Sequence, residues 1–152
     1  MAQPVEFFAY GSLLDQRLMR EMVGEWDSLS TARLPDHKLH FSHYSEEWKG
    51  ATADLEPARG ESVYGVIYRI FSYQFLEIGR QFPGYVERRI VVETEEGLRP
   101  ATTLVVGSPE AGLKPSGPYI KAIAEGMRQH GFAPSIRETL WRWTGSSGTG
   151  AP

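Results

Sequence analysis

The fold is decided at residues 7–14, where the sequence is Phe7-Phe8-Ala9-Tyr10-Gly11-Ser12-Leu13-Leu14. The aromatic and apolar run predicts a strand, and a helical pattern begins directly after the Tyr-Gly-Ser turn. A helix that starts there leaves backbone N–H groups without acceptors, and these favour a carboxylate or a developing oxyanion. Gly11 lets a ligand approach the main chain, and Ser12 can cap the helix. A tight turn without any ligand is the alternative interpretation.

The composition of the chain limits its partners and its compartment. Its 152 residues predict one domain over residues 1–144 and a flexible tail over residues 145–152. The net charge of -3 and the lack of a basic run argue against nucleic acid or a membrane surface as a partner. Cysteine is absent, which excludes disulfides and thiolate chemistry. We find no signal peptide or spanning segment and expect a cytoplasmic protein.

Strands and helices alternate irregularly along the sequence. Apolar patterns predict strands at residues 5–10, 38–41, 51–55, 63–70, 85–93 and 102–106, and helices at residues 14–23, 72–81, 116–131 and 134–143. The segments between them are expected to be irregular at residues 25–37, a loop at residues 42–50 and a turn at residues 57–61. Since these links do not form repeated βαβ units, we expect an α+β fold with a curved or closed mixed sheet and flanking helices.

The common catalytic motifs are absent. His37, His40 and His43 recur every three residues, but on a strand His40 would point away from the other two, so we expect no metal site. Ser12 has Tyr10 rather than glycine two residues before it, which argues against a serine hydrolase. Phosphate-binding loops of the Walker or Rossmann type are also missing.

Five short motifs follow one another at a characteristic spacing. They are Phe8-Ala9-Tyr10-Gly11-Ser12-Leu13; Trp48-Lys49-Gly50-Ala51-Thr52-Ala53-Asp54-Leu55; Val63-Tyr64-Gly65-Val66-Ile67-Tyr68 after Gly60; Pro83-Gly84-Tyr85 with Arg88-Arg89-Ile90-Val91-Val92; and Ser116-Gly117-Pro118-Tyr119. Together, over about residues 5–140, they resemble the γ-glutamylcyclotransferase-like family, which includes the AIG2-like proteins.

This resemblance implies a fold and a reaction. The expected fold is a compact mixed β-barrel of five to six strands with flanking helices. The expected reaction needs no cofactor: the α-amine of a γ-glutamyl group attacks its own γ-carbonyl, so that 5-oxoproline forms and an amine or amino acid leaves. Such a reaction is intramolecular, and folding the substrate into the attacking geometry removes much of the barrier. The implied partner is a small-molecule substrate, and the implied protein is a monomer or homodimer.

The resemblance also assigns residues to a pocket. Backbone N–H groups of residues 11–13 are expected to hold a substrate carboxylate or the oxyanion. The residues expected to bind substrate are Tyr10, Gly11, Ser12, Leu13, Trp48, Arg80 and Tyr85, with Tyr119 as a candidate acid. Core packing with a satisfied hydroxyl is the alternative for each tyrosine.

One position departs from the family pattern. The family places a general acid/base glutamate in a pattern like L-D-x-x-E-G, and an ungapped match puts Glu77 at the aspartate and Arg80 at the glutamate. Arg80 stays protonated and can at most pair with a carboxylate or lie in solvent. Arg80→Glu is therefore the substitution expected to raise activity.

Three explanations remain open for the missing glutamate. Another carboxylate can substitute, and the candidates are Asp54, Glu87, Glu47 and Glu77. Asp54 interrupts a short apolar strand, and burial of a carboxylate suits acid/base work, although a structural hydrogen bond is the alternative. Glu87 shares a strand face with Tyr85 or is a surface residue. Otherwise the pocket performs different chemistry, with Tyr119 or Tyr85 as the acid, or binds a ligand without catalysis.

Overall fold

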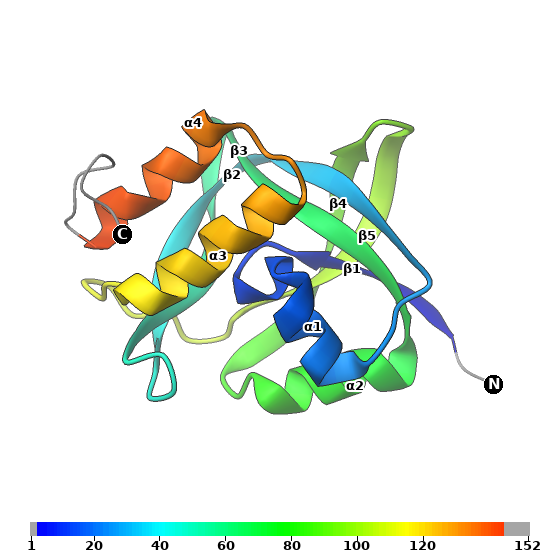
Figure 1. The fold of residues 1–152 in the computed structure, drawn as a ribbon, viewed down its shortest axis with the longest axis horizontal. Helices are drawn as coiled ribbons and strands as arrows, with labels where there is room; N and C mark the ends of the chain where they lie inside the picture. Colours follow the sequence, from blue (N-terminus) through cyan, green and yellow to red (C-terminus); the bar gives the residue numbers. More distant parts are fainter. Residues whose placement is uncertain (1–2, 145–152) are drawn as a thin grey trace.

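The protein is built around a closed barrel of five strands, as the computed structural model shows in Figure 1. The structure describes residues 3–144, and the predicted tail at residues 145–152 lies outside them. The strands are neighbours in the order β1-β3-β2-β4-β5. Their bounds are β1 Pro4–Ala9, β2 Ser28–Ser45, β3 Gly50–Phe71, β4 Tyr85–Thr94 and β5 Gly97–Val106. The prediction of an α+β barrel with five to six strands is confirmed.

The long antiparallel pair of β2 and β3 corrects the sequence prediction most. Residues 28–37 are strand rather than irregular chain, the predicted loop at residues 42–50 is strand as far as Ser45, and β3 runs through the predicted turn at residues 57–61. The turn signals lie opposite each other. The register shifts between Pro35 and His37, and Asp36, at a φ of 59°, accepts a hydrogen bond from the Gly60 N–H at 3.0 Å. The turn signals at Pro35-Asp36 and at residues 57–61 therefore produce an irregularity in the β2–β3 ladder and do not reverse the chain.

The barrel closes through two short contacts. Strand β1 pairs along its whole length with β3, but it meets β5 in parallel at a single residue pair, Phe7 with Thr102. Strand β2 meets β4 in register only at Arg33 and Glu93, whose side chains also form an ion pair. Beyond Phe7, β1 and β5 are no longer paired, and this is where the chain turns into Gly11 and Ser12.

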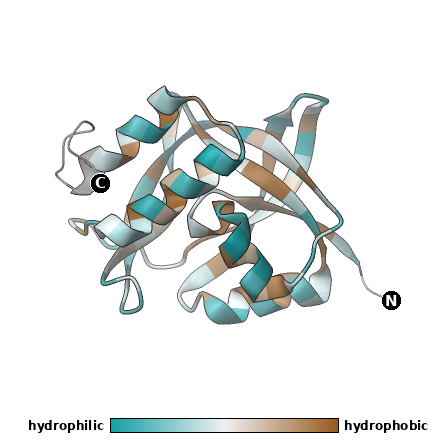
Figure 2. Cartoon of the chain, viewed as in Figure 1, coloured by the Kyte–Doolittle hydropathy of each residue, from teal (hydrophilic) through white to brown (hydrophobic). Residues whose placement is uncertain are grey.

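The helices cover the outside of this barrel. They are α1 Gln16–Val23, α2 Ser72–Gln81, α3 Gly117–Gln129 and α4 Pro134–Glu138, with 3-10 turns η1 Ser12–Leu14 and η2 Thr139–Thr144. Figure 1 shows α1 and α3 next to each other on one side, with α2 below them. Hydrophobic residues alternate with hydrophilic ones along α3 and the strands, as expected for faces that pack on a core (Figure 2).

The helix starts differ from the prediction in one detail. The segment predicted as one helix at residues 14–23 is divided into η1 and α1. The N-cap of α1 is Asp15, whose Oδ1 accepts the Arg17 N–H at 3.0 Å, so the prediction that Ser12 caps the helix is wrong. The last predicted helix likewise consists of α4 and η2. No helix within residues 3–144 is long and apolar enough to span a bilayer.

The close approach of β1 to β3 depends on Gly65. A Cβ atom at this position would lie 2.4 Å from the Ala9 carbonyl oxygen and 2.7 Å from the Phe8 ring. We therefore expect Gly65→Ala to lower the free energy of unfolding by about 1–3 kcal/mol, the usual cost of overpacking. The measurement is urea denaturation.

Gly79→Ala is the matched control, because a Cβ atom at Gly79 in α2 meets nothing within 4 Å. That substitution is expected to stabilise the protein by about 0.5–1 kcal/mol through helix propensity. Equal destabilisation by the two substitutions would contradict the steric argument.

Candidate functional site

A small cavity opens where β1 and β5 separate. Its volume is about 50 Å³, and its lining comes from the end of β1, the turn into η1, β3, the α2–β4 link, the start of β4, β5 and α3. The lining residues are Phe7, Phe8, Ala9, Tyr10, Gly11, Ser12, Leu13, Ala53, Phe82, Tyr85, Thr103, Leu104 and Tyr119. Six of the residues proposed from the sequence are thus brought together, namely Tyr10, Gly11, Ser12, Leu13, Tyr85 and Tyr119.

The turn at Gly11 forms one wall of the cavity. Glycine leaves space here that a side chain would fill. A Cβ atom would lie 3.0 Å from the Tyr119 hydroxyl and 3.3 Å from the Ala53 Cβ atom. The turn is closed by the Leu14 N–H, which donates to the Gly11 carbonyl at 3.0 Å. The N–H groups of Gly11 and Leu13 have no acceptor among the described residues, as at any helix start.

Two of the three cavity tyrosines donate to backbone carbonyls. The Tyr10 hydroxyl donates to the Leu104 carbonyl at 2.6 Å and thereby crosses the gap between β1 and β5. The Tyr85 hydroxyl donates to the Ala53 carbonyl at 2.6 Å and lies 2.7 Å from the Thr52 hydroxyl. Burial raises the pKa of both phenols well above 10. Tyr10 and Tyr85 therefore line the cavity as uncharged side chains, and their hydroxyl protons are already hydrogen-bonded to backbone carbonyls.

Tyr119 differs from the other two in its backbone partner, which is an N–H group and not a carbonyl. Its hydroxyl oxygen accepts the Ala53 N–H at 2.9 Å. Burial raises the pKa of Tyr119 to about 12, and hydrogen bonds from Ala53 and Ser12 limit that rise. No backbone carbonyl among the described residues takes its proton. Of the three phenols, Tyr119 is thus the one whose proton is not held by a backbone carbonyl among the described residues, with Ser12 as its side-chain neighbour.

Trp48 lies behind this group. Its ring centroid is 5.2 Å from that of Tyr119 in an edge-on arrangement, and the side chain is half-buried. Trp48 does not line the cavity itself. Its proposed role in substrate binding stays a prediction. Through its ring contact, Trp48 can orient Tyr119.

Arg80 lies away from the cavity. Its side chain is 71% exposed and pairs with Glu77 on the same helix, with 2.9 Å between Arg80 Nη1 and Glu77 Oε1. The residue that enters the cavity from the end of α2 is Phe82, whose ring centroid lies 5.7 Å from that of Tyr85. Sequence reasoning missed Phe82, although an apolar residue directly before Pro83-Gly84 at a helix end was an available signal. Arg80 is therefore not among the residues that line this cavity, and its role in substrate binding stays a prediction.

Asp54 is buried, but three protein donors occupy its carboxylate. Oδ1 accepts the Leu55 N–H at 2.8 Å and the Val106 N–H at 3.1 Å, and Oδ2 accepts the Ser42 hydroxyl at 2.8 Å. These bonds join β3 to β2 and to the end of β5 next to the cavity. Asp54 is not among the lining residues. A role as acid or base therefore stays a prediction, whereas its structural role is visible.

The other carboxylate candidates lie outside the cavity as well. Glu87 is exposed in a separate groove of about 490 Å³, which it shares with Leu76 and Arg89. Glu77 is held by Arg80, and Glu47 is exposed in the turn between β2 and β3. Within residues 3–144, no three histidine or carboxylate side chains gather as metal ligands would. The described lining of the cavity carries no charged side chain.

Comparisons with known proteins place this geometry in context. No family model matches the chain. A mouse protein named gamma-glutamylcyclotransferase is 30% identical over 144 residues, which cover 88% of this chain and 76% of that protein. The bovine protein of the same name gives the same figures. A solved structure named gamma-glutamyl cyclotransferase superposes with a TM-score of 0.85 at 26% identity, covering 91% of this chain and 87% of the other.

The hydrogen bonds of Asp54 lead to a stability prediction. Asp54→Ala would leave two buried N–H groups and the Ser42 hydroxyl without their acceptor. We expect the free energy of unfolding to fall by about 1–3 kcal/mol, the cost of unsatisfied buried groups. Urea denaturation measures this loss, and Glu87→Ala, at an exposed position, is the control expected to have little effect. A fully stable Asp54→Ala protein would remove the structural role and return Asp54 to the list of candidate bases.

Proposed function

Because the chain belongs to the γ-glutamylcyclotransferase family, we propose that it converts a γ-glutamyl-type conjugate into 5-oxoproline and a free amine or amino acid. The observation that carries the proposal is the pairing of two kinds of donor in one cavity. Gly11 and Leu13, whose N–H groups have no acceptor among the described residues, line the same cavity as Tyr119, whose proton no backbone carbonyl holds. Acyl transfer needs donors of both kinds, one for a developing oxyanion and one for the leaving nitrogen.

The first step is attack of the substrate's own α-amine on its γ-carbonyl. The cavity favours the folded substrate because aromatic rings and the turn leave little space, and a folded substrate has its reacting atoms already adjacent. As the carbon–nitrogen bond forms, the carbonyl oxygen becomes an oxyanion. The N–H groups of Gly11 and Leu13 are the donors that would hold it, and they require no reorganisation.

The second step is collapse of the tetrahedral intermediate and release of the amine. The bond to the leaving nitrogen breaks, and this nitrogen takes the proton of the Tyr119 hydroxyl. Hydrogen bonds from Ala53 and Ser12 stabilise the phenolate that results. Tyr119 regains a proton from the attacking nitrogen, which has one in excess after ring closure. Protons and electrons therefore balance within the substrate and Tyr119, and this chemistry uses no cofactor.

A second candidate function follows from the uncharged cavity. No carboxylate lines it among the described residues, so no side chain there can take a proton from a substrate ammonium group. This observation favours a repurposed member of the family that binds an amino-acid-like ligand or performs different small-molecule chemistry. Asp54 or Glu87 as a base would require a substrate that reaches beyond the lining residues.

The deciding experiment is 5-oxoproline release, followed by mass spectrometry, from a panel of γ-glutamyl amino acids and γ-glutamyl amines. We expect release by the wild-type protein and a loss of about 10²- to 10⁴-fold in Tyr119→Phe, as for removal of a general acid. Tyr73→Phe is the matched control, because Tyr73 is exposed on α2 and does not line the cavity. Release from no substrate would support the binding-only alternative, and equal rates in wild type and Tyr119→Phe would exclude Tyr119 as the acid.

A charged group introduced from the end of α2 tests the uncharged cavity. Phe82→Glu places a carboxylate at a lining position, whereas Arg80→Glu places one in solvent. We expect release to rise by roughly 10-fold or more in Phe82→Glu, below the usual gain from a well-placed base, and to stay unchanged in Arg80→Glu. A rise in Arg80→Glu without a rise in Phe82→Glu would mean that residue 80 turns toward the substrate, as the match to the family pattern predicted.

A further inference from the structure

The last turn of α3 packs directly on the turn that lines the cavity. A Cβ atom at Gly126 would lie 2.4 Å from the Leu14 carbonyl carbon and 2.5 Å from the Asp15 nitrogen. Since these are backbone atoms, they cannot move aside as a flexible side chain can. The helix and the turn therefore meet at backbone distance, and the position of one determines the position of the other.

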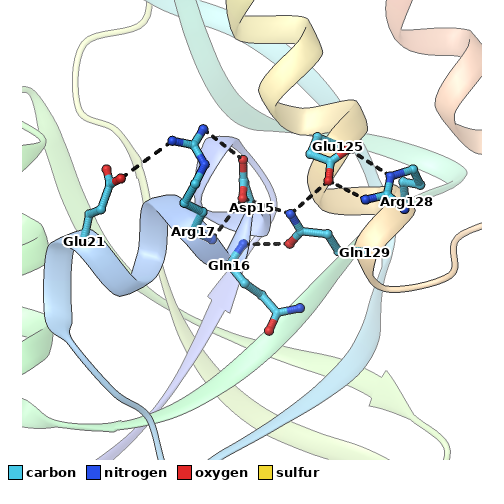
Figure 3. Close-up of polar contacts among 7 residues, drawn as sticks. All are labelled: Asp15, Gln16, Arg17, Glu21, Glu125, Arg128 and Gln129. Atoms are coloured by element: carbon cyan, nitrogen blue, oxygen red, sulfur yellow. Dashed lines mark hydrogen bonds and ion pairs between the residues drawn. The ribbon is translucent and has the colours of Figure 1, made fainter.

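Gln129 joins α3 to the start of α1 with hydrogen bonds in both directions. Its Oε1 accepts the Gln16 N–H at 2.8 Å, and its Nε2 donates to Asp15 Oδ1 at 3.0 Å and to Glu125 Oε2 at 3.2 Å. Figure 3 shows the Gln129 amide lying between the two helices, with Asp15 on one side and Glu125 on the other. Gln129 thus satisfies a free N–H of α1 and orients the residue that caps it.

Two further bonds hold the carbonyls of the same turn. His130 Nε2 lies 2.9 Å from the Leu14 carbonyl oxygen, and the Tyr68 hydroxyl donates to the Leu13 carbonyl at 2.8 Å. The outer side of the turn is therefore bonded to α3 and β3. The N–H groups of Gly11 and Leu13, two residues that line the cavity, have no acceptor among the described residues.

We propose that Gln129 is a positioning residue for the donors of Gly11 and Leu13, an inference that rests on the proposed function. It touches no ligand and acts through Asp15 and Gln16, which follow the turn directly. Its amide is suited to this because one group accepts from an N–H and the other donates to a carboxylate. When the amide is removed, the Gln16 N–H and the Asp15 carboxylate lose their hydrogen bonds to α3, and the turn at residues 11–14 becomes more mobile. Misplacement of a donor by about 1 Å costs on the order of 10²-fold in rate.

The test compares Gln129→Met with Arg128→Met in the full-length protein. Methionine keeps the length of the glutamine side chain and removes its polar atoms. Arg128 is the neighbour on the same turn, and its hydrogen bonds and ion pair among the described residues go to Glu125 at the surface. We measure kcat and KM for 5-oxoproline release and amide hydrogen exchange at Leu14 and Asp15, at a temperature where both variants are folded by circular dichroism.

We expect kcat to fall by about 10²-fold in Gln129→Met, with KM changed much less, because the donors act on the oxyanion rather than on the bound substrate. Exchange at Leu14 and Asp15 should become faster in this variant and stay unchanged in Arg128→Met. Gln129→Glu can still accept the Gln16 N–H and should recover part of the rate, although it places a carboxylate near Asp15 and Glu125.

Three results would overturn the inference. One is an unchanged kcat in Gln129→Met, another is an equal loss in Arg128→Met, and the third is unchanged amide exchange at Leu14 and Asp15. If the wild-type protein releases no 5-oxoproline, the proposed function fails by itself. In that case the exchange measurement decides by itself. Faster amide exchange at Leu14 and Asp15 in Gln129→Met, but not in Arg128→Met, still supports the positioning role of Gln129, and unchanged exchange overturns it.

Discussion

The single parallel contact between β1 and β5 is the constraint on which the site depends. Phe7 and Thr102 close the barrel, and beyond them the ladder ends and a side chain joins the two strands, since the Thr103 hydroxyl donates to the Phe8 carbonyl at 2.7 Å. A strand edge that is left open inside a protein has unpaired N–H and carbonyl groups, which need other partners. The Tyr10 hydroxyl meets one of them by donating to the Leu104 carbonyl, and η1 turns the chain away from the barrel. The cavity therefore follows from how the barrel closes.

The peptide groups of Ala53 divide the roles of the tyrosines around this opening. The Ala53 carbonyl accepts the Tyr85 hydroxyl, whereas the Ala53 N–H donates to the Tyr119 oxygen. One residue of β3 thus uses up the proton of one phenol and leaves the proton of the other available. The bonds of Asp54 to β2 and β5 fix this part of β3 in place. Asp54 can therefore matter for the chemistry without touching a substrate.

Most of the fold and part of the site could be predicted from the sequence. The turn at residues 10–13 and the tyrosines belong to motifs with local signals, and the structure brings them together. The extent of β2 and β3 could not be predicted, because Pro35-Asp36 and Pro57 are usually turn signals and only their pairing across the ladder makes them a bulge. The orientation of Arg80 and Phe82 could not be predicted either. The two residues are two positions apart at the end of α2. Arg80 points to solvent and Phe82 lines the cavity, and the rotation of the helix about its axis decides which of them faces inward.

The uncharged lining determines which groups can move protons in this cavity. Burial keeps Tyr10 and Tyr85 protonated at neutral pH, since it raises the pKa of each phenol. The rise at Tyr119 is limited, because the Ala53 N–H and Ser12 favour its phenolate. Without a carboxylate in the lining, an ammonium group would be desolvated there without compensation. In the reaction that we propose, the substrate amine would enter in its neutral form, which is also the form that can attack a carbonyl. In the same proposal, Tyr119 would pass a proton between the two nitrogens of the substrate, and its phenolate would exist only as long as the tetrahedral intermediate.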